Sequence, residues 1–399
     1  MVKIGKREIS KDFFIFIIIS ILLGVVSAVE STSLANRLYE DLDFTVMQRS
    51  MLETPRELPG LLSVVIIGML NGLGDIRIAA VANIIGGVGL LCFGMTPNVF
   101  SLVLLFLVFY STGQHLYIPL SHTIGMSFAK GGSFGERLGQ VQSITSISVI
   151  ATSGVLFVLY KFFNASYAVV FTMAGVAMIG AGALFFMIGK NSKKIVSEKR
   201  FVFRKEFKMY YVLSVINGAR KQITITFVPW LLIDIYDRPV TYITAMFFIV
   251  CILNVFFKPW YGRLIDRRGE SYALQFEAVI MFLACIGFAF AKVTLPFYVA
   301  LAAASVCYIG DKLMEQASGM ARATLAKKIS NQEAEVARTL TMGQSMDHAV
   351  SMCIPLLAGA AWYAGGANGY MYVFIGALVI SMVNFIIARK LKVHQPEKA

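Results

Sequence analysis

Five ionised side chains lie inside otherwise apolar stretches of the chain. Arg220 and Lys221 are adjacent in one stretch. Asp311, Lys312 and Glu315 lie close together in a second stretch. A charge at the centre of a bilayer costs roughly 2.5–3.5 kcal/mol even on lenient insertion scales, so such residues need a partner or a purpose. They are therefore the first candidates for handling a substrate.

The composition indicates that these stretches lie in a membrane. Of 399 residues, 57% are hydrophobic and 15% are charged, and the mean hydropathy is +0.71. A soluble domain carries about 25% charged residues. The formal net charge of +13 would favour a nucleic-acid partner in a soluble protein, but the basic residues here fall in short segments between apolar runs. The sequence predicts a multi-pass protein of the lipid bilayer that binds no nucleic acid.

Runs of about 20 apolar residues are long enough to cross a hydrocarbon core of roughly 30 Å as helices. The basic residues concentrate on alternate connections, beginning with Lys3, Lys6 and Arg7, which predicts a plasma (inner) membrane protein with both termini in the cytosol. Twelve spans are predicted, centred in 12–32, 58–74, 78–96, 99–126, 139–160, 166–189, 208–235, 240–261, 272–291, 295–321, 338–363 and 369–389.

Residues 31–57 form the longest predicted outer connection. Pro55 and Pro59 would interrupt a continuous helix, so the segment is interpreted as a solvated connection that also begins the second span. The alternative is an amphipathic outer helix. Glu30, at the outer end of the first span, is interpreted as a wetted terminal residue.

The chain divides near its middle at a densely basic connector. We predict an N-terminal six-helix half at 1–189, a cytosolic linker at 190–207 and a C-terminal six-helix half at 208–399. Two sets of six helices joined by a basic loop are typical of a transporter built from two similar halves.

A motif follows the eighth predicted span. The chain reads Gly262-Arg263-Leu264-Ile265-Asp266-Arg267-Arg268-Gly269, which closely resembles the GxLxDRxGRR signature of the major facilitator superfamily. At the equivalent place in the first half it reads Asn71-Gly72-Leu73-Gly74-Asp75-Ile76-Arg77, without the leading Gly or the Gly-Arg-Arg end. Asp75 and Asp266 are 191 residues apart, which fits an internal duplication. The alternative for the copy at residues 262–269 is an ordinary basic turn.

The resemblance implies an all-α membrane protein with twelve transmembrane helices in two six-helix halves, acting as a monomer by alternating access. It also implies that the motif loops latch the halves together when the protein is open to the outside. The latch residues are then Asp75, Arg77, Gly262, Arg263, Asp266, Arg267, Arg268 and Gly269.

In that fold, helices 1, 4, 7 and 10 line the central cavity, and the polar residues fall on three of these four helices. The expected substrate-binding residues are Gln114, His115, Tyr117, Asn217, Arg220, Lys221, Tyr308 and Lys312. The expected proton-coupling residues are Asp311, Glu315, Asp347 and His348.

Helix geometry limits these roles. Arg220 and Lys221 are about 100° apart around a helix, so one is expected to face the cavity while the other pairs with an acid on a neighbouring helix. Asp347 is the obvious partner. Lys312 and Glu315 are three apart and could pair within their own helix. The structural alternative is an ion-pair network that only holds the helices together.

Charges of both signs suit a small organic anion or zwitterion as the substrate, with one carboxylate taking a proton and coupling transport to the proton gradient. The alternatives are proton-driven efflux of multiple drugs or lipophilic compounds, a lipid flippase and a permease-like sensor. An enzyme is not expected, because the sequence has no phosphate-binding glycine loop, metal cluster or nucleophile constellation. No cofactor or metal is expected either.

Overall fold

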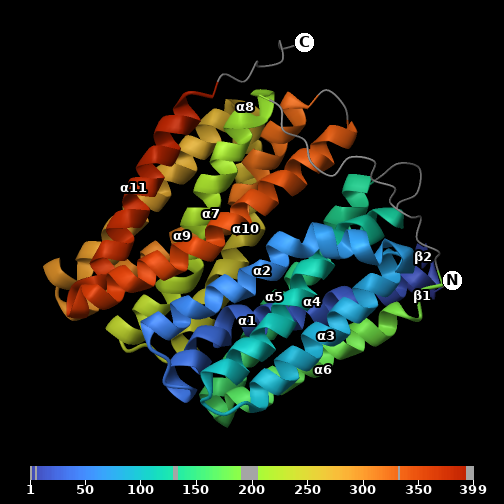
Figure 1. The fold of residues 1–399 in the computed structure, drawn as a ribbon, viewed down its shortest axis with the longest axis horizontal. Helices are drawn as coiled ribbons and strands as arrows, with labels where there is room; N and C mark the ends of the chain where they lie inside the picture. Colours follow the sequence, from blue (N-terminus) through green and yellow to red (C-terminus); the bar gives the residue numbers. More distant parts are fainter. Residues whose placement is uncertain (1, 5–6, 129–133, 190–204, 331–332, 392–399) are drawn as a thin grey trace. The chain divides into compact units, whose positions relative to one another are not determined.

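The structure is a computed structural model that describes residues 2–4, 7–128, 134–189, 205–330 and 333–391. These residues are almost entirely helical (Figure 1). A short antiparallel hairpin of β1 (Val2–Ile4) and β2 (Arg7–Ile9), with Val2 opposite Ile9, precedes the first helix. The α-helices are α1 (Lys11–Asn36), α2 (Val46–Leu70), α3 (Asp75–Met95), α4 (Phe100–Ser127), α5 (Phe134–Phe163), α6 (Tyr167–Phe185), α7 (Lys208–Trp230), α8 (Val240–Thr294), α9 (Phe297–Ile329), α10 (Glu333–Ala364) and α11 (Gly369–Arg389).

The 55-residue α8 is two helices joined at Gly269, the last residue of the sequence motif. Gly269 has φ of 83°, a left-handed conformation that glycine adopts without steric cost. The ten other α-helices and the two parts of α8 together give twelve helical rods among the described residues, which is the predicted number.

Eight of the described helices are long and apolar enough to cross a membrane. The three α-helices outside that group are α2, α7 and α10. These three carry buried charged residues in place of apolar ones, including Arg49, Arg220 and Asp347. Buried charges lower the mean hydropathy of these three helices, although α8 and α9 also bury charged residues, among them Glu277 and Asp311.

The described chain forms two compact units. Unit 1 contains the described parts of Met1–Asp43, Pro55–Val196 and Val240–Phe248. Unit 2 contains those of Phe44–Thr54, Ser197–Pro239 and Ile249–Ala399. The predicted boundary at 190–207 remains a prediction, because residues 190–204 lie outside the described part of the chain.

One local structure occurs in both units. The π-helical turn η1 (Arg37–Asp41) continues α1, and the π-helical turn η4 (Leu231–Ile235) continues α7. Each turn is followed by an aspartate with positive φ, Asp43 at 49° and Asp237 at 52°. These aspartates are 194 residues apart, close to the spacing of the two sequence motifs, which supports an internal duplication.

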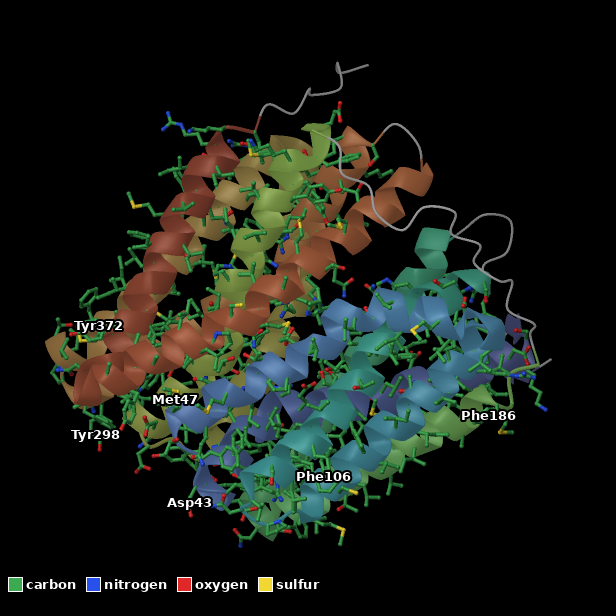
Figure 2. The ribbon with its side chains drawn as sticks, viewed as in Figure 1. Asp43, Met47, Phe106, Phe186, Tyr298 and Tyr372 are labelled. Carbon is green, nitrogen blue, oxygen red and sulfur yellow. The ribbon has the colours of Figure 1, made fainter. Side chains whose placement is uncertain are left out.

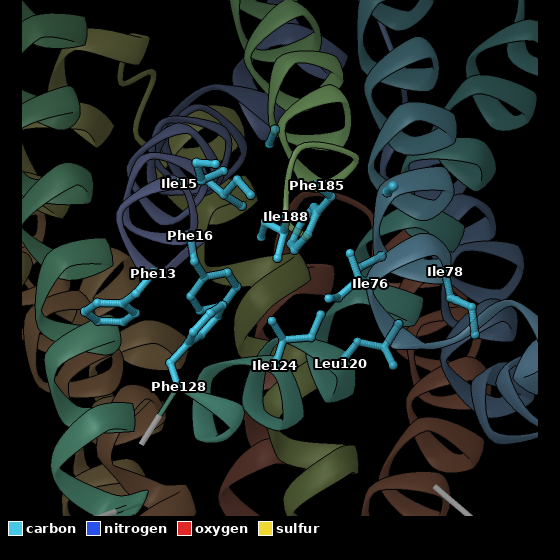
Figure 3. Close-up of a cluster of buried hydrophobic side chains, with 14 residues drawn as sticks. Phe13, Ile15, Phe16, Ile76, Ile78, Leu120, Ile124, Phe128, Phe185 and Ile188 are labelled. Atoms are coloured by element: carbon cyan, nitrogen blue, oxygen red, sulfur yellow. The ribbon is translucent and has the colours of Figure 1, made fainter. Parts of the chain in front are cut away.

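Each unit has its own apolar core. In unit 1, Phe16 packs between Phe128 and Phe185 in a cluster that joins α1, α3, α4 and α6 (Figure 3). In unit 2, a cluster around Leu213, Tyr261 and Leu325 joins α7, α8 and α9, with a contribution from α11. Large apolar side chains are also exposed, among them Tyr298 of α9, Tyr372 of α11 and Phe186 just after α6 (Figure 2). Exposed apolar surface of this kind suits contact with lipid.

The interpretation of residues 31–57 as a solvated connection is wrong. Pro55 and Pro59 lie inside the continuous helix α2, and the residues before them include the buried Leu42, Phe44 and Leu52. A proline in a membrane helix is tolerated where neighbouring groups satisfy the freed backbone. In unit 1 the Ser111 hydroxyl donates to the carbonyl of Arg56, close to both prolines.

Candidate functional site

The centre of unit 2 contains a lysine–aspartate pair between α7 and α10. The Lys221 ammonium donates to an Asp347 carboxylate oxygen, and Asn217 Nδ2 donates to the other oxygen at 2.8 Å. The side chains of Lys221 and Asp347 retain 24% and 12% exposure, so the pair is not fully buried. The structure therefore confirms the expected contact of Asp347 with α7.

The neighbouring Arg220 points to a different partner. Its Nη2 lies 3.3 Å from Oε1 of Glu277, in the second rod of α8, and 3.4 Å from Oδ1 of Asn217. Arg220 and Glu277 are each only 1% exposed. The sequence predicted that one of the two cations, Arg220 or Lys221, would pair with an acid. In the structure both do. Asn217 contacts both pairs.

Glu277 was missed by the sequence reasoning. Its carboxylate also lies 3.8 Å from Nη1 of Arg322 on α9, so two arginines from two helices approach one buried acid. Glu277 is the only charged residue in the apolar segment 272–291, which indicates a buried charge. The predicted site was built on the five charges in other segments and did not include it.

Asp311 on α9 is the most deeply buried acid of the site. Its exposure is 0%, and neither carboxyl oxygen has a hydrogen-bond partner among the described residues. Several charged and titratable groups interact electrostatically with Asp311. They are Arg220 of α7, Cys285 of α8, and Cys307, Tyr308, Lys312 and Glu315 of its own helix.

The predicted contact within α9 is present. Lys312 Nζ lies 2.6 Å from Oε2 of Glu315, and both side chains are largely buried. Tyr308, one turn earlier, is buried. His348 is buried beside Asp347 on α10. Asn217, Arg220 and Lys221 of α7 thus share one contact network with Asp347 of α10, and Lys312 and Glu315 of α9 form a pair of their own.

Unit 1 has a second polar cluster, centred on Glu30 of α1. Its carboxylate accepts hydrogen bonds from Tyr110 Oη at 2.6 Å, Gln114 Nε2 at 2.9 Å and Arg56 Nη2 at 3.0 Å. Glu30 is therefore not a wetted terminal residue, because three donors from α2 and α4 satisfy it. The sequence reasoning placed it too near the helix end, since η1 extends the helical segment to Asp41.

The other predicted residues of α4 lie nearby or apart. His115 Nδ1 lies 3.0 Å from the Ser111 hydroxyl, in the turn that also contacts Arg56. Tyr117 packs edge-on against Phe185, with ring centroids 5.9 Å apart, beside the apolar core of unit 1. Gln114 and His115 therefore belong to the polar side of α4.

Another buried cluster in unit 2 was missed. Arg49 and Glu53 form an ion pair on the first turns of α2, and Glu53 Oε2 accepts a hydrogen bond from Gln222 of α7 at 2.9 Å. The Thr54 hydroxyl donates to the carbonyl of Met352 on α10. The i, i+4 spacing of Arg49 and Glu53 was a signal for a helical pair, but the segment was interpreted as a connection.

The residues of the predicted latch occupy the expected turns. Asp75 is buried at the first residue of α3, whereas Arg77 is exposed. In the second copy, Gly262 is partly buried, Arg263, Asp266, Arg267 and Arg268 are exposed, and Gly269 forms the kink. The ion pair that ties this turn to α9 joins Glu270 and Lys328, at 2.8 Å. The latch role itself stays a prediction.

Comparison with known proteins identifies relatives of this fold. The sequence model of the Major Facilitator Superfamily matches residues 13–326. No curated protein matches the chain.

Among solved structures, the nucleoside transporter NupG is 14% identical with a TM-score of 0.75, covering 96% of this chain and 100% of its own. A D-xylose-proton symporter is 16% identical with a TM-score of 0.66, covering 94% and 96%. A POT family transporter in complex with 5-aminolevulinic acid is 11% identical with a TM-score of 0.70, covering 97% and 98%. At these identities the likeness shows the fold alone.

Proposed function

This chain belongs to the major facilitator superfamily, and we propose that it carries a small organic anion or zwitterion across the membrane together with protons. Family membership makes it a multi-pass integral membrane protein and a secondary transporter, not an enzyme. We further propose that it acts as a monomer in the plasma (inner) membrane with both termini in the cytosol.

The observation that carries proton coupling is the environment of Asp311. Burying an ionised carboxylate without hydrogen bonds costs far more than burying its neutral acid, so such a group takes up a proton instead. Asp311 is fully buried, and neither of its oxygens has a hydrogen-bond partner among the described residues. Asp311 is therefore assigned as the proton carrier, neutral in this conformation.

The substrate is assigned to the more accessible pair, Lys221 and Asp347. The Lys221 ammonium would bind a substrate carboxylate, and Asp347 would bind an amine or accept hydrogen bonds from hydroxyl groups. Asn217 holds Asp347 in place through its amide, at 2.8 Å. Arg220 is too deeply buried to be the first group that a substrate meets.

Two of the solved relatives are consistent with this proposal. One is named as a proton symporter, and another was solved with 5-aminolevulinic acid, a compound with one amine and one carboxyl group. A zwitterion of that kind matches the two charges of Lys221 and Asp347.

The test begins with a ligand screen on the purified protein. Thermal stabilisation is measured with amino acids, 5-aminolevulinic acid, monocarboxylates and lipophilic cations. A carboxylate-bearing compound should stabilise the protein, and the Lys221→Ala variant should lose that effect. Stabilisation by lipophilic cations alone would instead favour drug efflux.

The best stabiliser is then used as the transport probe in liposomes that contain a pH-sensitive dye. We expect the native protein to acidify or alkalinise the lumen when the probe is added. Asp311→Asn should abolish this proton movement but keep exchange of labelled for unlabelled probe, because exchange needs no net proton transfer. Proton movement that persists in Asp311→Asn would overturn the assignment.

A further inference from the structure

Three basic residues lie together where the second rod of α8 begins and α11 ends. The Ser271 hydroxyl donates to the carbonyl of Ala388 at 2.7 Å, so the start of this rod contacts the last turn of α11. Arg268 lies shortly before Ser271 along the chain, and Arg389 and Lys390 directly follow Ala388. All three basic side chains are exposed. Arg268, Arg389 and Lys390 are called the basic patch below.

Little negative charge offsets the basic patch. Glu270 is only 1% exposed and pairs with Lys328 at 2.8 Å, so its charge is already compensated. The other acid between residues 262 and 272 is Asp266, which the exposed Arg267 beside it balances. Among the described residues, no carboxylate forms an ion pair with a member of the basic patch. The patch therefore keeps its positive charge for an anion from outside the chain.

An exposed apolar stripe leads away from the basic patch along each of the two helices. The rings of Phe288 and Phe374 are 5.1 Å apart, toward the opposite end from the Ser271 contact, so the helices run side by side. Both are apolar enough to cross a membrane. Spacings of three, four and seven residues place each stripe on one helix face. The stripes contain Tyr272, Val279, Leu283 and Ile286 on α8, and Ile375, Val379, Met382 and Ile386 on α11.

Arg268 and Tyr272 connect the charge with the apolar stripe of α8. The guanidinium carbon of Arg268 lies 5.1 Å from the centre of the Tyr272 ring. A cation over an aromatic face is attracted by the ring, and tyrosine is enriched where the apolar membrane meets the headgroups. A basic helix end that only followed the topology of the chain would need neither this ring contact nor the stripes.

We propose that the basic patch binds the headgroup of an anionic phospholipid, whose acyl chains lie along the two apolar stripes. Arg268 and Arg389 supply planar donors for the phosphate oxygens, and Lys390 adds a point charge. Basic pockets between membrane helices bind anionic headgroups in this way. The lipid bridges α8 and α11 beside Gly269, and so stabilises the end of unit 2 that carries the motif turn. The proposal does not depend on the identity of the transported solute.

Lipid binding is measured on the purified full chain in neutral detergent, by native mass spectrometry and by the thermal unfolding temperature. Phosphatidylglycerol should form a defined complex and raise the unfolding temperature. Phosphatidylcholine with the same acyl chains should do so much less, because it has no net charge. Inorganic phosphate at the same concentration should have no effect, because it lacks the chains. Equal stabilisation by phosphatidylcholine, or by phosphate alone, would overturn the proposal.

Charge-removing variants then locate the site. Arg268→Gln, Arg389→Gln and Lys390→Gln should each weaken phosphatidylglycerol binding about fivefold, and the triple variant about a hundredfold. The patch is exposed, so the unfolding temperature without lipid should match that of the native protein and show that the variants fold. The matched control is Lys161→Gln, at an exposed position on α5, which should bind lipid as the native protein does. An equal loss in Lys161→Gln, or unchanged binding in the triple variant, would refute the site.

Discussion

Gly218 of α7 packs directly against the backbone of Asp347 in α10. A Cβ on Gly218 would lie 2.5 Å from the Asp347 carbonyl oxygen and 2.8 Å from its Cα. This close approach lets Asn217 and Lys221, on either side of the glycine along α7, reach the Asp347 side chain. The ion pair therefore depends on a helix contact that only glycine permits.

Gly218→Ala should consequently damage both stability and the site. Forcing a methyl group against backbone atoms typically costs about 1–3 kcal/mol. We expect a lower thermal unfolding temperature and weaker stabilisation by the carboxylate probe. Gly376→Ala on α11, where an added Cβ meets nothing within 4 Å, is the matched control and should leave both measurements unchanged. Equal behaviour of the two variants would contradict the packing described.

The Lys221–Asp347 pair yields a prediction that separates binding from architecture. Lys221→Ala should remove a charge-assisted hydrogen bond to the bound substrate, worth roughly 1.5–3 kcal/mol. The substrate concentration at half-saturation should therefore rise about tenfold or more. The thermal unfolding temperature without ligand should change little, because the lysine is partly exposed and Asn217 still donates to Asp347. A large loss of stability with transport intact would support the purely structural network instead.

Arg49 and Glu53 provide the contrasting case. Both are almost fully buried, and Gln222 is a further donor to Glu53. Arg49→Ala would break this buried ion pair, and removing one partner of a buried pair typically costs about 3–5 kcal/mol. We expect a clear drop in the unfolding temperature, whereas Lys208→Ala, at an exposed position, should have none. Should Arg49→Ala be as stable as the native protein, the buried pair would not contribute as described.

The orientation of the chain is predicted from its basic segments. Reporter fusions at the C-terminus, and a tag inserted within 190–207, should both be accessible only from the cytosolic side. Access from the outside at either place would reverse the predicted topology.

The sequence was sufficient for the fold because hydrophobic length and basic loops are local properties. The twelve rods and the turn at Gly269 follow from runs of apolar residues and one motif. Where local rules were applied alone they failed, as with Pro55 and Pro59. The loss of helix hydrogen bonds at these two prolines is offset by tertiary contacts, such as that of Ser111 with the Arg56 carbonyl, which a local sequence pattern does not show.

The site was predictable in its residues but not in its pairings. Arg220, Lys221, Asp311 and Asp347 stand out as charges in apolar runs, and periodicity indicated that Arg220 and Lys221 diverge. Whether Glu277 or Asp347 contacts Arg220 depends on how the helices are rotated and packed. Residue spacing within one helix does not determine these long-range properties. Glu30 was misjudged for the same reason, since its three donors come from helices remote in sequence.

The central claim is that Asp311 holds a proton in this conformation, and infrared spectroscopy at neutral pH measures it most directly. We predict a protonated carboxyl band in the native protein that is absent from Asp311→Asn and retained in Asp347→Asn and Glu315→Gln. A spectrum without such a band, or one in which the band survives in Asp311→Asn, would contradict the claim.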